Sequence, residues 1–266
     1  MKKIFLVGAS VFALGMGSAM AGNTSDVDQA NTSNTATVSQ TQAGATGNTS
    51  DVDQLGQGGV VFVEQVGASN SSVASQAAEA QGSRITVNQD GQLNSSNVNQ
   101  DDVAQIGSTN GGRVFATVGQ TGASNIADIQ QGTASFFQRG TATIEQVGDS
   151  NTGRIFQAAE AGRGRLSTVT ASILQDGDGN LAETEQYSVG SIGDGLGSGN
   201  TSSTSQLGDG SQAFVTQGGG GNASVVNQTV DAGGVGHFAQ VTQIGNGHDS
   251  MVNQAGSGHS ATVTQN

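Results

Sequence analysis

The chain has 266 residues, of which 43 are Gly and none is Pro, Cys or Trp, and its formal net charge is −13. The absence of Cys excludes a disulfide framework and a thiolate metal site. With only 33% hydrophobic residues, the sequence is too poor in apolar side chains for an ordinary globular core. Because Pro removes a ladder N–H and is kept out of sheet interiors, its absence favours a chain that is strand almost throughout.

The first residues have the organisation of a secretory signal peptide. Lys2 and Lys3 precede an apolar stretch over 4–16, and Ala19-Met20-Ala21 is a small-x-small cleavage site. We therefore predict a signal peptide over 1–21 and a mature chain over 22–266, whose formal charge is −15 once the two Lys residues are removed from the −13 of the whole chain. The short stretch argues against a membrane anchor, and no further apolar run of membrane length follows it, so no membrane span is expected after cleavage. The acidic charge argues against a nucleic-acid partner.

The rest of the chain is one long repeat, N-x-small-x-V-x-Q followed by a four-residue turn. Nineteen Gln residues end these units, and eleven of the eighteen steps between them equal 11, so the period is not an accident of composition. The series is Gln29, Gln40, Gln54, Gln65, Gln76, Gln89, Gln100, Gln120, Gln131, Gln146, Gln157, Gln175, Gln186, Gln206, Gln217, Gln228, Gln243, Gln254 and Gln265.

Each unit alternates with period two, which places its Asn, its small residue, its Val and its Gln on one face. The third of these slots is Val or Ile in sixteen units, with Ala74, Thr184 and Thr204 as the exceptions, whereas the other face follows no rule. A regular face indicates burial, and no window shows the apolar spacing of a helix. We therefore predict an all-β fold over 22–266, a cross-β type β-solenoid of stacked repeats with two strands per coil.

The inward amides are predicted to form side-chain ladders along the stack, which replace the missing Leu and Phe. Turn glycines are predicted to supply a positive φ where the chain reverses, at Gly67, Gly91, Gly122, Gly148 and Gly245. The ladder residues that we single out, besides the Gln series, are Asn34, Asn48, Asn70, Asn94, Asn125, Asn151, Asn180 and Asn222.

The longer joints between Gln54 and Gln217 fall on alternate positions, which in a two-strand coil lie along one edge. The corresponding loops are predicted at 77–82, 101–113, 132–139, 158–168 and 187–199. Two interpretations stay open for them: loops that merely tolerate insertion, or a decorated edge that binds a partner.

All three His residues, His237, His248 and His259, occupy the first inward slot, where Asn is expected. They are interpreted as Asn-like ladder members, as a stack that makes the C-terminal coil pH-sensitive, or as a metal site. The segment 176–180 resembles the start of a calcium loop, but it coincides with a predicted turn. No inward carboxylate pair and no nucleophile motif is present, so we expect no catalytic residues, no cofactor and no enzyme activity.

The pattern Q-x-G-x-x-N-x-A-x-V-x-Q resembles the curlin repeat. Gln89-Gly91-Asn94-Ser96-Val98-Gln100 and Gln120-Gly122-Asn125-Ala127-Ile129-Gln131 match it closely, and such units cover essentially the whole mature chain. The resemblance implies a secreted bacterial subunit that polymerises at the cell surface into extracellular amyloid fibres, which serve adhesion and the biofilm matrix. It also implies a nucleator subunit and an outer-membrane export pore as partners.

Polymerisation is also favoured by physics, because an uncapped solenoid exposes strand edges that template further strands. Asp26, Asp28, Asp51 and Asp53 lie on outward slots near the N-terminus, where like charges are expected to slow premature stacking. The alternative function is a monomeric surface β-solenoid that acts as an adhesin or binding module through the loops on one edge. An ice-binding solenoid is a third interpretation, although the outward Thr row that it needs is only scattered.

Overall fold

The computed structural model describes residues 22–77, 82–101, 113–132, 139–159, 169–188 and 199–266. The predicted signal peptide and most residues of the five predicted loops lie outside these ranges. The described residues form nineteen β-strands and no helix, which confirms the all-β prediction. None of their elements is a long apolar helix of the kind that crosses a membrane.

One strand corresponds to each predicted unit, and each contains one Gln of the series. The strands are β1 (Thr24–Gln29), β2 (Thr35–Gln42), β3 (Thr49–Gln54), β4 (Val60–Ala68), β5 (Ser71–Gln76), β6 (Arg84–Gln92), β7 (Ser95–Gln100), β8 (Arg113–Ala123), β9 (Ile126–Gln131), β10 (Arg139–Val147), β11 (Thr152–Ala159), β12 (Val169–Asp176), β13 (Leu181–Ser188), β14 (Thr201–Leu207), β15 (Gln212–Gly220), β16 (Ala223–Val230), β17 (Phe238–Asn246), β18 (Asp249–Gly256) and β19 (Ser260–Gln265).

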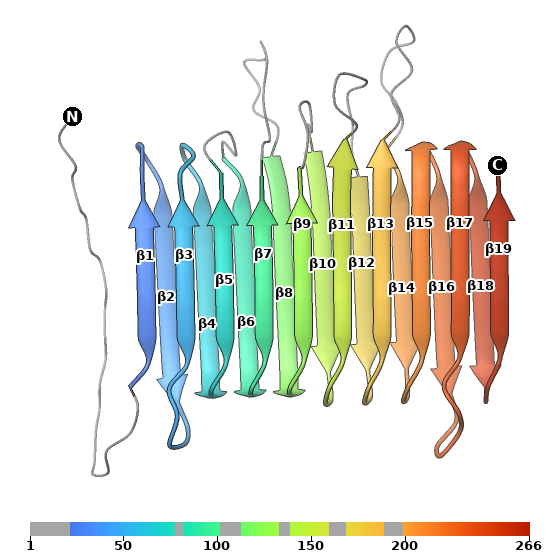
Figure 1. The fold of residues 1–266 in the computed structure, drawn as a ribbon, viewed down its shortest axis with the longest axis horizontal. Coiled ribbons are helices and arrows are strands. Elements are labelled where there is room, and N and C mark those ends of the chain that lie inside the picture. Colours follow the sequence, from blue (N-terminus) through green and yellow to red (C-terminus); the bar gives the residue numbers. More distant parts are fainter. Residues whose placement is uncertain (1–21, 78–81, 102–112, 133–138, 160–168, 189–198) are drawn as a thin grey trace, which may run out of the picture.

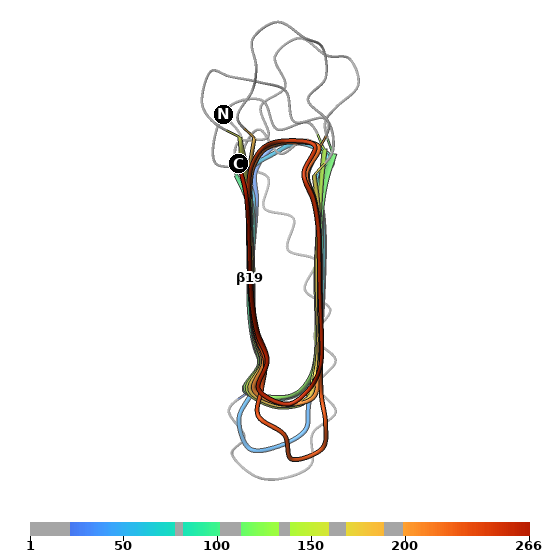
Figure 2. The ribbon, with the colours of Figure 1, turned by 90° about the vertical axis from the view of Figure 1, so that its right-hand side faces the viewer.

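The strands alternate between two sheets, so two strands make one coil, as predicted. The ten odd-numbered strands form one sheet, here called the odd sheet, and the nine even-numbered strands form the other, the even sheet. Strands run one way in the odd sheet and the opposite way in the even sheet (Figure 1). Seen along the stack, each coil is a flat, narrow loop with the two sheets as its long sides (Figure 2).

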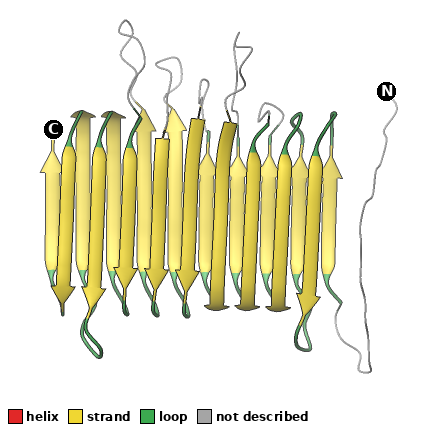
Figure 3. Ribbon diagram, turned by 180° about the vertical axis from the view of Figure 1, so that it is seen from behind, coloured by secondary structure: helices red, strands yellow, loops and turns green. Residues whose placement is uncertain are grey.

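Every neighbouring pair within a sheet is parallel and in register on its Gln. Gln29 of β1 is opposite Gln54 of β3, and Gln40 of β2 is opposite Gln65 of β4. Identical slots of successive coils therefore lie above one another, which lets one small set of side chains repeat along the whole stack. From behind, the even strands show the same regular spacing (Figure 3).

The core is a thin layer between the two sheets, built from the inward slots. Ile144 and Ile173 are fully buried, and the inward and outward residues of β12 alternate between buried and partly buried. Two clusters of apolar residues in the described part of the core are separated at β13 and β14, because Thr184 and Thr204 stand where other coils have Val or Ile. The hydroxyls of Thr184 and Ser202 lie 3.4 Å apart across this polar stretch.

The turn glycines have the positive φ that the sequence predicts, for example 117° at Gly122 and 105° at Gly148. A second constraint was not predicted: successive coils approach so closely that a Cβ on Gly122 would lie 2.1 Å from the carbonyl oxygen of Gly148. Glycine is therefore required there both by the backbone conformation and by stacking.

The five predicted loops each follow an odd strand and precede an even strand, so the strands that flank them meet on one edge of the stack. The opposite edge carries the even-to-odd turns. Two of these are longer than the rest, 43–48 between β2 and β3 and 231–237 between β16 and β17, and they extend beyond the other turns at the bottom of Figure 2.

Candidate functional site

The Gln side chains of the series stack into two continuous rows, one on each sheet. In the odd sheet, each Nε2 donates to the Oε1 of the next Gln at 2.6–3.1 Å. In the even sheet the corresponding distances are 2.7–3.0 Å. Interior members such as Gln146 and Gln175 are fully buried, whereas Gln29, Gln40 and Gln265 in the end coils are only partly buried.

The same Gln amides also hold the two sheets together. The Nε2 of Gln146 donates to the carbonyl of Ile126 at 3.0 Å, and Gln265 donates to the carbonyl of Asp249 at 3.0 Å. In each case the acceptor belongs to the preceding strand, on the opposite sheet. Most interior amides, such as that of Gln146, thus join their own strand, the next strand of their sheet and the strand across the core, which satisfies the buried polar group.

The Asn rows bond differently from the predicted side-chain ladder. The backbone N–H of Asn70 donates to Oδ1 of Asn48 at 3.0 Å, while Nδ2 of Asn70 donates to the turn carbonyls of Val66 and Gly91 at 3.0 and 3.1 Å. The physical reason is reach: the shorter Asn side chain stands beside the turn, where backbone groups are closer than the next amide. Asn125 alone, among the described Asn contacts, also donates from Nδ2 to the Oδ1 of a row neighbour, Asn94, at 3.2 Å.

All eight Asn residues singled out from the sequence lie beside a turn and accept a backbone N–H of the next coil at Oδ1. Asn23 and Asn200, which the prediction omitted, do the same. The members are Asn23, Asn34, Asn48, Asn70, Asn94, Asn125, Asn151, Asn180, Asn200 and Asn222.

The three His residues take over the Asn position in the last coils. His237 and His259 are neighbours on the odd sheet with ring centroids 5.2 Å apart and planes 8° from parallel, and His248 lies on the even sheet. The backbone N–H of His259 donates to Nδ1 of His237 at 3.1 Å, and Nε2 of His237 lies 3.0 Å from the carbonyl oxygen of Thr229. A neutral ring with its proton on Nε2 therefore makes both bonds of an Asn amide, with Nδ1 as the acceptor.

The outward carboxylates of the first odd strands stack directly on one another. Asp26 pairs with Asp51 and Asp28 with Asp53 in the register of β1 and β3. Burial, and then the charges of Asp28 and Asp51, raise the pKa of Asp53 above its usual value. The folded N-terminal coils therefore disfavour ionisation of this carboxyl group.

A row of Asp residues along the even-to-odd edge was missed by the sequence analysis. The Oδ1 of Asp149 accepts the backbone N–H of Ala123 at 2.7 Å, Asp178 accepts from Asp149 at 2.7 Å, and Asp209 accepts from Asp178 at 2.9 Å. The sequence did contain a signal for this row, because Asp recurs at the second position of the four-residue turns 148–151, 177–180 and 208–211. The calcium-loop-like segment 176–180 contributes Asp178 to this row, and the side chain of Asp178 bonds the turn of the preceding coil.

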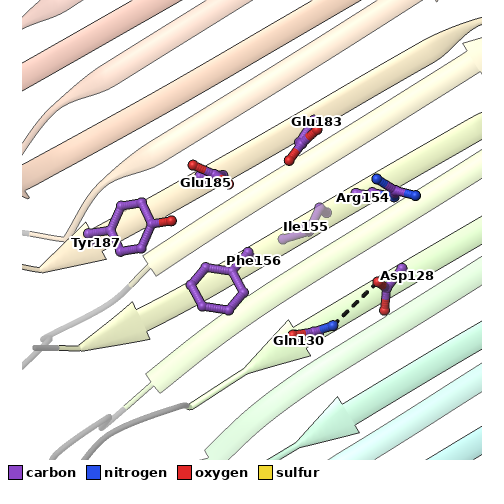
Figure 4. Close-up of a pocket in the computed structure, with 8 residues that line it drawn as sticks. All are labelled: Asp128, Gln130, Arg154, Ile155, Phe156, Glu183, Glu185 and Tyr187. Carbon is purple, nitrogen blue, oxygen red and sulfur yellow. Dashed lines mark hydrogen bonds between the residues drawn. The ribbon is translucent and has the colours of Figure 1, made fainter.

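A shallow pocket on the outer face of the odd sheet, spanning β9, β11 and β13, was also missed (Figure 4). Arg154 lies in register between Asp128 and Glu183, and the rings of Phe156 and Tyr187 have centroids 5.6 Å apart. Burial, followed by the charge and hydrogen bond of Glu185 and the charge of Glu183, raises the pKa of the Tyr187 hydroxyl. The irregular outward slots give no repeat signal from which to predict this group.

The described residues hold no cluster of three or more His, Asp or Glu side chains placed to bind a metal ion. The metal interpretation of the His residues thus has no carboxylate or third ligand to support it among these residues.

The family model of the Curlin associated repeat matches residues 238–266, which comprise β17, β18 and β19. A comparison with curated proteins found no match. The matched segment has the same strand, register and Gln row as the coils before it. The repeat match and the β-solenoid thus agree with the curlin resemblance of the sequence.

Proposed function

We propose that this chain is a secreted, non-enzymatic structural subunit that self-associates into cross-β fibres at the cell surface, where the fibres serve adhesion and a biofilm matrix. The curlin repeat supports this role, because the resemblance implies fibre subunits. The same resemblance makes a nucleator subunit and an outer-membrane export pore the proposed partners.

The observation that carries the proposal is the open state of both ends of the described stack. β1 and β19 each have one unpaired edge in the odd sheet, and β2 and β18 each have one in the even sheet. The inward Val27 of β1 is 37% exposed, whereas its counterpart one coil further in, Val52, is 0% exposed. Stacking a further strand on these ends would bury the inward Val side chains and extend the backbone and Gln hydrogen bonds.

The test is self-assembly of the purified chain after dilution from denaturant. We expect thioflavin-positive fibres whose diffraction has a meridional reflection near 4.7 Å and an equatorial one near 10 Å. A chain that remains a folded monomer for days at micromolar concentration would contradict the proposal.

A second candidate function is the monomeric binding module, and the pocket around Arg154 is the observation that favours it. Its aromatic and charged residues occupy an outer face that neither the coils nor a fibre end covers. Replacing Arg154, Phe156 and Tyr187 by Ser would abolish ligand or surface binding under this alternative and leave fibre growth unchanged. The predicted loop edge is the other surface that this alternative uses, and its residues lie largely outside the described ranges.

A further inference from the structure

We infer that successive copies of this chain join with a half-turn about the fibre axis, so that β1 of one copy continues the even sheet of the previous copy and β2 continues its odd sheet. This inference rests on the proposed fibre function and specifies its joint. In the joint, β1 pairs with β18 and β2 pairs with β19. The contrasting arrangement is a direct stack without rotation, in which β1 pairs with β19.

Strand number is the first argument. The described stack has ten odd and nine even strands, and it both begins and ends on the odd sheet. In a direct stack the odd sheet would be continuous, but the even sheet would lack one strand between β18 and the next β2. A half-turn about the axis removes this gap, because the first strand of the next copy takes the vacant place. The rotation also reverses the direction of the strands of the next copy. Because odd and even strands run in opposite directions (Figure 1), β1 of the next copy is then parallel to β18, and β2 is parallel to β19.

The cross-core bonds of Gln are the second argument. Gln40 donates to the carbonyl of Thr24, the first residue of the preceding strand, at 3.1 Å, and Gln265 donates to the first residue of β18 at 3.0 Å. Gln29 on β1 has no preceding strand among the described residues. With a half-turn, β19 lies across the core from β1, and the carbonyl of Ser260 takes the place that Thr24 has for Gln40. In a direct stack that place is vacant.

The inward side chains match at the rotated joint. When the strands are aligned on their Gln, Ser25, Val27 and Gln29 of β1 meet Ser250, Val252 and Gln254 of β18. Likewise Ala36, Val38 and Gln40 of β2 meet Ala261, Val263 and Gln265 of β19. These three inward slots each meet their own residue type, whereas a direct stack would place Ser25 on Ala261.

The outward residues and the His rings also fit this joint. β2 reads TATVSQ over its first six residues and β19 reads SATVTQ, so hydroxyls face hydroxyls along the outer row. Asp26 meets Met251 and Asp28 meets Asn253, so no carboxylate meets another. The Nε2 atoms of His248 and His259 lie 3.1 and 2.9 Å from the backbone carbonyl oxygens of Ile244 and Ala255, as Nε2 of His237 lies beside Thr229. By analogy with His237, whose Nδ1 accepts the backbone N–H of His259, their Nδ1 atoms would accept the backbone N–H groups of Asn23 and Asn34 of the next copy.

Engineered disulfides across the joint distinguish the two arrangements, because the chain has no Cys of its own. Neighbouring in-register strands are about 4.8 Å apart, within the Cα separation that a disulfide allows. The double variant Thr262→Cys/Thr37→Cys tests the rotated joint, and Thr262→Cys/Asp26→Cys tests the direct stack. All three positions are exposed and outward, and the paired sites lie at opposite ends of one chain, so a bond requires two copies. Single-Cys variants control for lateral contact between fibres.

We expect oxidised Thr262→Cys/Thr37→Cys fibres to give a ladder of covalent multimers after denaturation, and Thr262→Cys/Asp26→Cys fibres to give mainly monomers. Met251→Cys/Asp26→Cys should cross-link as well, because it reports the β18–β1 half of the same joint. Fibres that cross-link through positions 262 and 26, or through none of these pairs, would overturn the inference and leave the fibre function intact. A chain that forms no fibres would overturn the proposed function itself.

A second measurement needs no contact at the joint. Ala45 is exposed in the longer even-to-odd turn over 43–48, and Ala45→Cys accepts a maleimide gold label. Nine and a half coils give a subunit rise of about 46 Å, so labels should alternate between the two sides of the fibre and recur on one side about every 90 Å. Labels along one side only would contradict the half-turn.

Discussion

The interior coils and the end coils carry the same motif in different surroundings. In an interior coil, Gln146 accepts a hydrogen bond from Gln120 and donates to Gln175 and to Ile126, and it is fully buried. At the end of the stack, Gln265 is partly buried and its row ends. An inward Gln amide thus makes both of its row bonds only when a coil lies on each side of it. The interactions that stabilise the interior coils are therefore the same ones that would join the ends of two copies.

The largest effect is expected from a turn glycine in the interior. In Gly122→Ala the new Cβ would lie 2.1 Å from the backbone oxygen of Gly148, at a φ of 117°. We expect a loss of about 4 kcal/mol in the free energy of unfolding, measured by denaturant titration of the freshly diluted monomer. The matched control is Gly256→Ala in an end coil, where φ is 107° but only side-chain atoms lie within 4 Å.

The control should lose only about 1 kcal/mol, the cost of the backbone conformation alone. Equal losses in Gly122→Ala and Gly256→Ala would show that coil-to-coil contact does not set the requirement for glycine.

The next effect separates the two roles of the Gln rows. Gln146→Leu would remove the acceptor of Gln120 Nε2, the donor to Gln175 Oε1 and the donor to the carbonyl of Ile126, at a cost of about 3 kcal/mol in the free energy of unfolding. Gln265→Leu in the last strand should cost less than about 1 kcal/mol, because its surroundings are accessible to water.

Although Gln265→Leu should cost little in the free energy of unfolding, it should have a large effect on fibre growth. Gln265→Leu should slow elongation from preformed seeds at least tenfold, because it removes the donor of the next row bond. If Gln265→Leu fibres grow at the rate of the unmodified chain, the end of the Gln row does not take part in assembly.

A smaller effect is expected where His replaces Asn. His237→Asn should keep the free energy of unfolding within about 0.5 kcal/mol, because Oδ1 can accept from His259 as Nδ1 does. His237→Leu should lose about 1–2 kcal/mol, since it leaves that N–H and the carbonyl of Thr229 without partners. Equal stability of the two variants would contradict the Asn-like bonding.

The pH-sensitive role of the His residues stays a prediction. A triple variant with Asn at 237, 248 and 259 separates it from the structural role. An unchanged pH profile of fibre growth between about pH 5 and 8 would rule out a switch.

The smallest effect concerns the acidic end coil. The folded-state pKa of Asp53 is raised above its unfolded value, chiefly by burial and then by Asp28 and Asp51. The stabilising contribution of this group is therefore fully present below the unfolded pKa and is lost as the pH rises through the folded pKa. Amide exchange in β1 and β3, corrected for intrinsic rates, should be slower at acidic pH than at neutral pH. Asp53→Asn should weaken this dependence, and an unaltered dependence would assign it to other groups.

The sequence predicts the strands, their alternation between two sheets and the Gln rows, because a period of 11 with one fixed face leaves few other folds. It does not predict how the Asn side chains bond, since that depends on their distance from the turn carbonyls. The approach of Gly122 to Gly148 and the Asp row are likewise contacts between coils, which spacing within one coil does not reveal. The pocket around Arg154 arises from outward slots that follow no rule.

Cryo-electron microscopy of fibres grown from the unmodified chain tests the central claim most directly, namely that each copy is a solenoid and that copies join by their end strands. The account predicts nineteen stacked strands per copy, with the Gln rows continuing from Gln254 and Gln265 of one copy into Gln29 and Gln40 of the next. Fibres in which each copy occupies a single layer, with every residue stacked on the same residue of its neighbours, would contradict it.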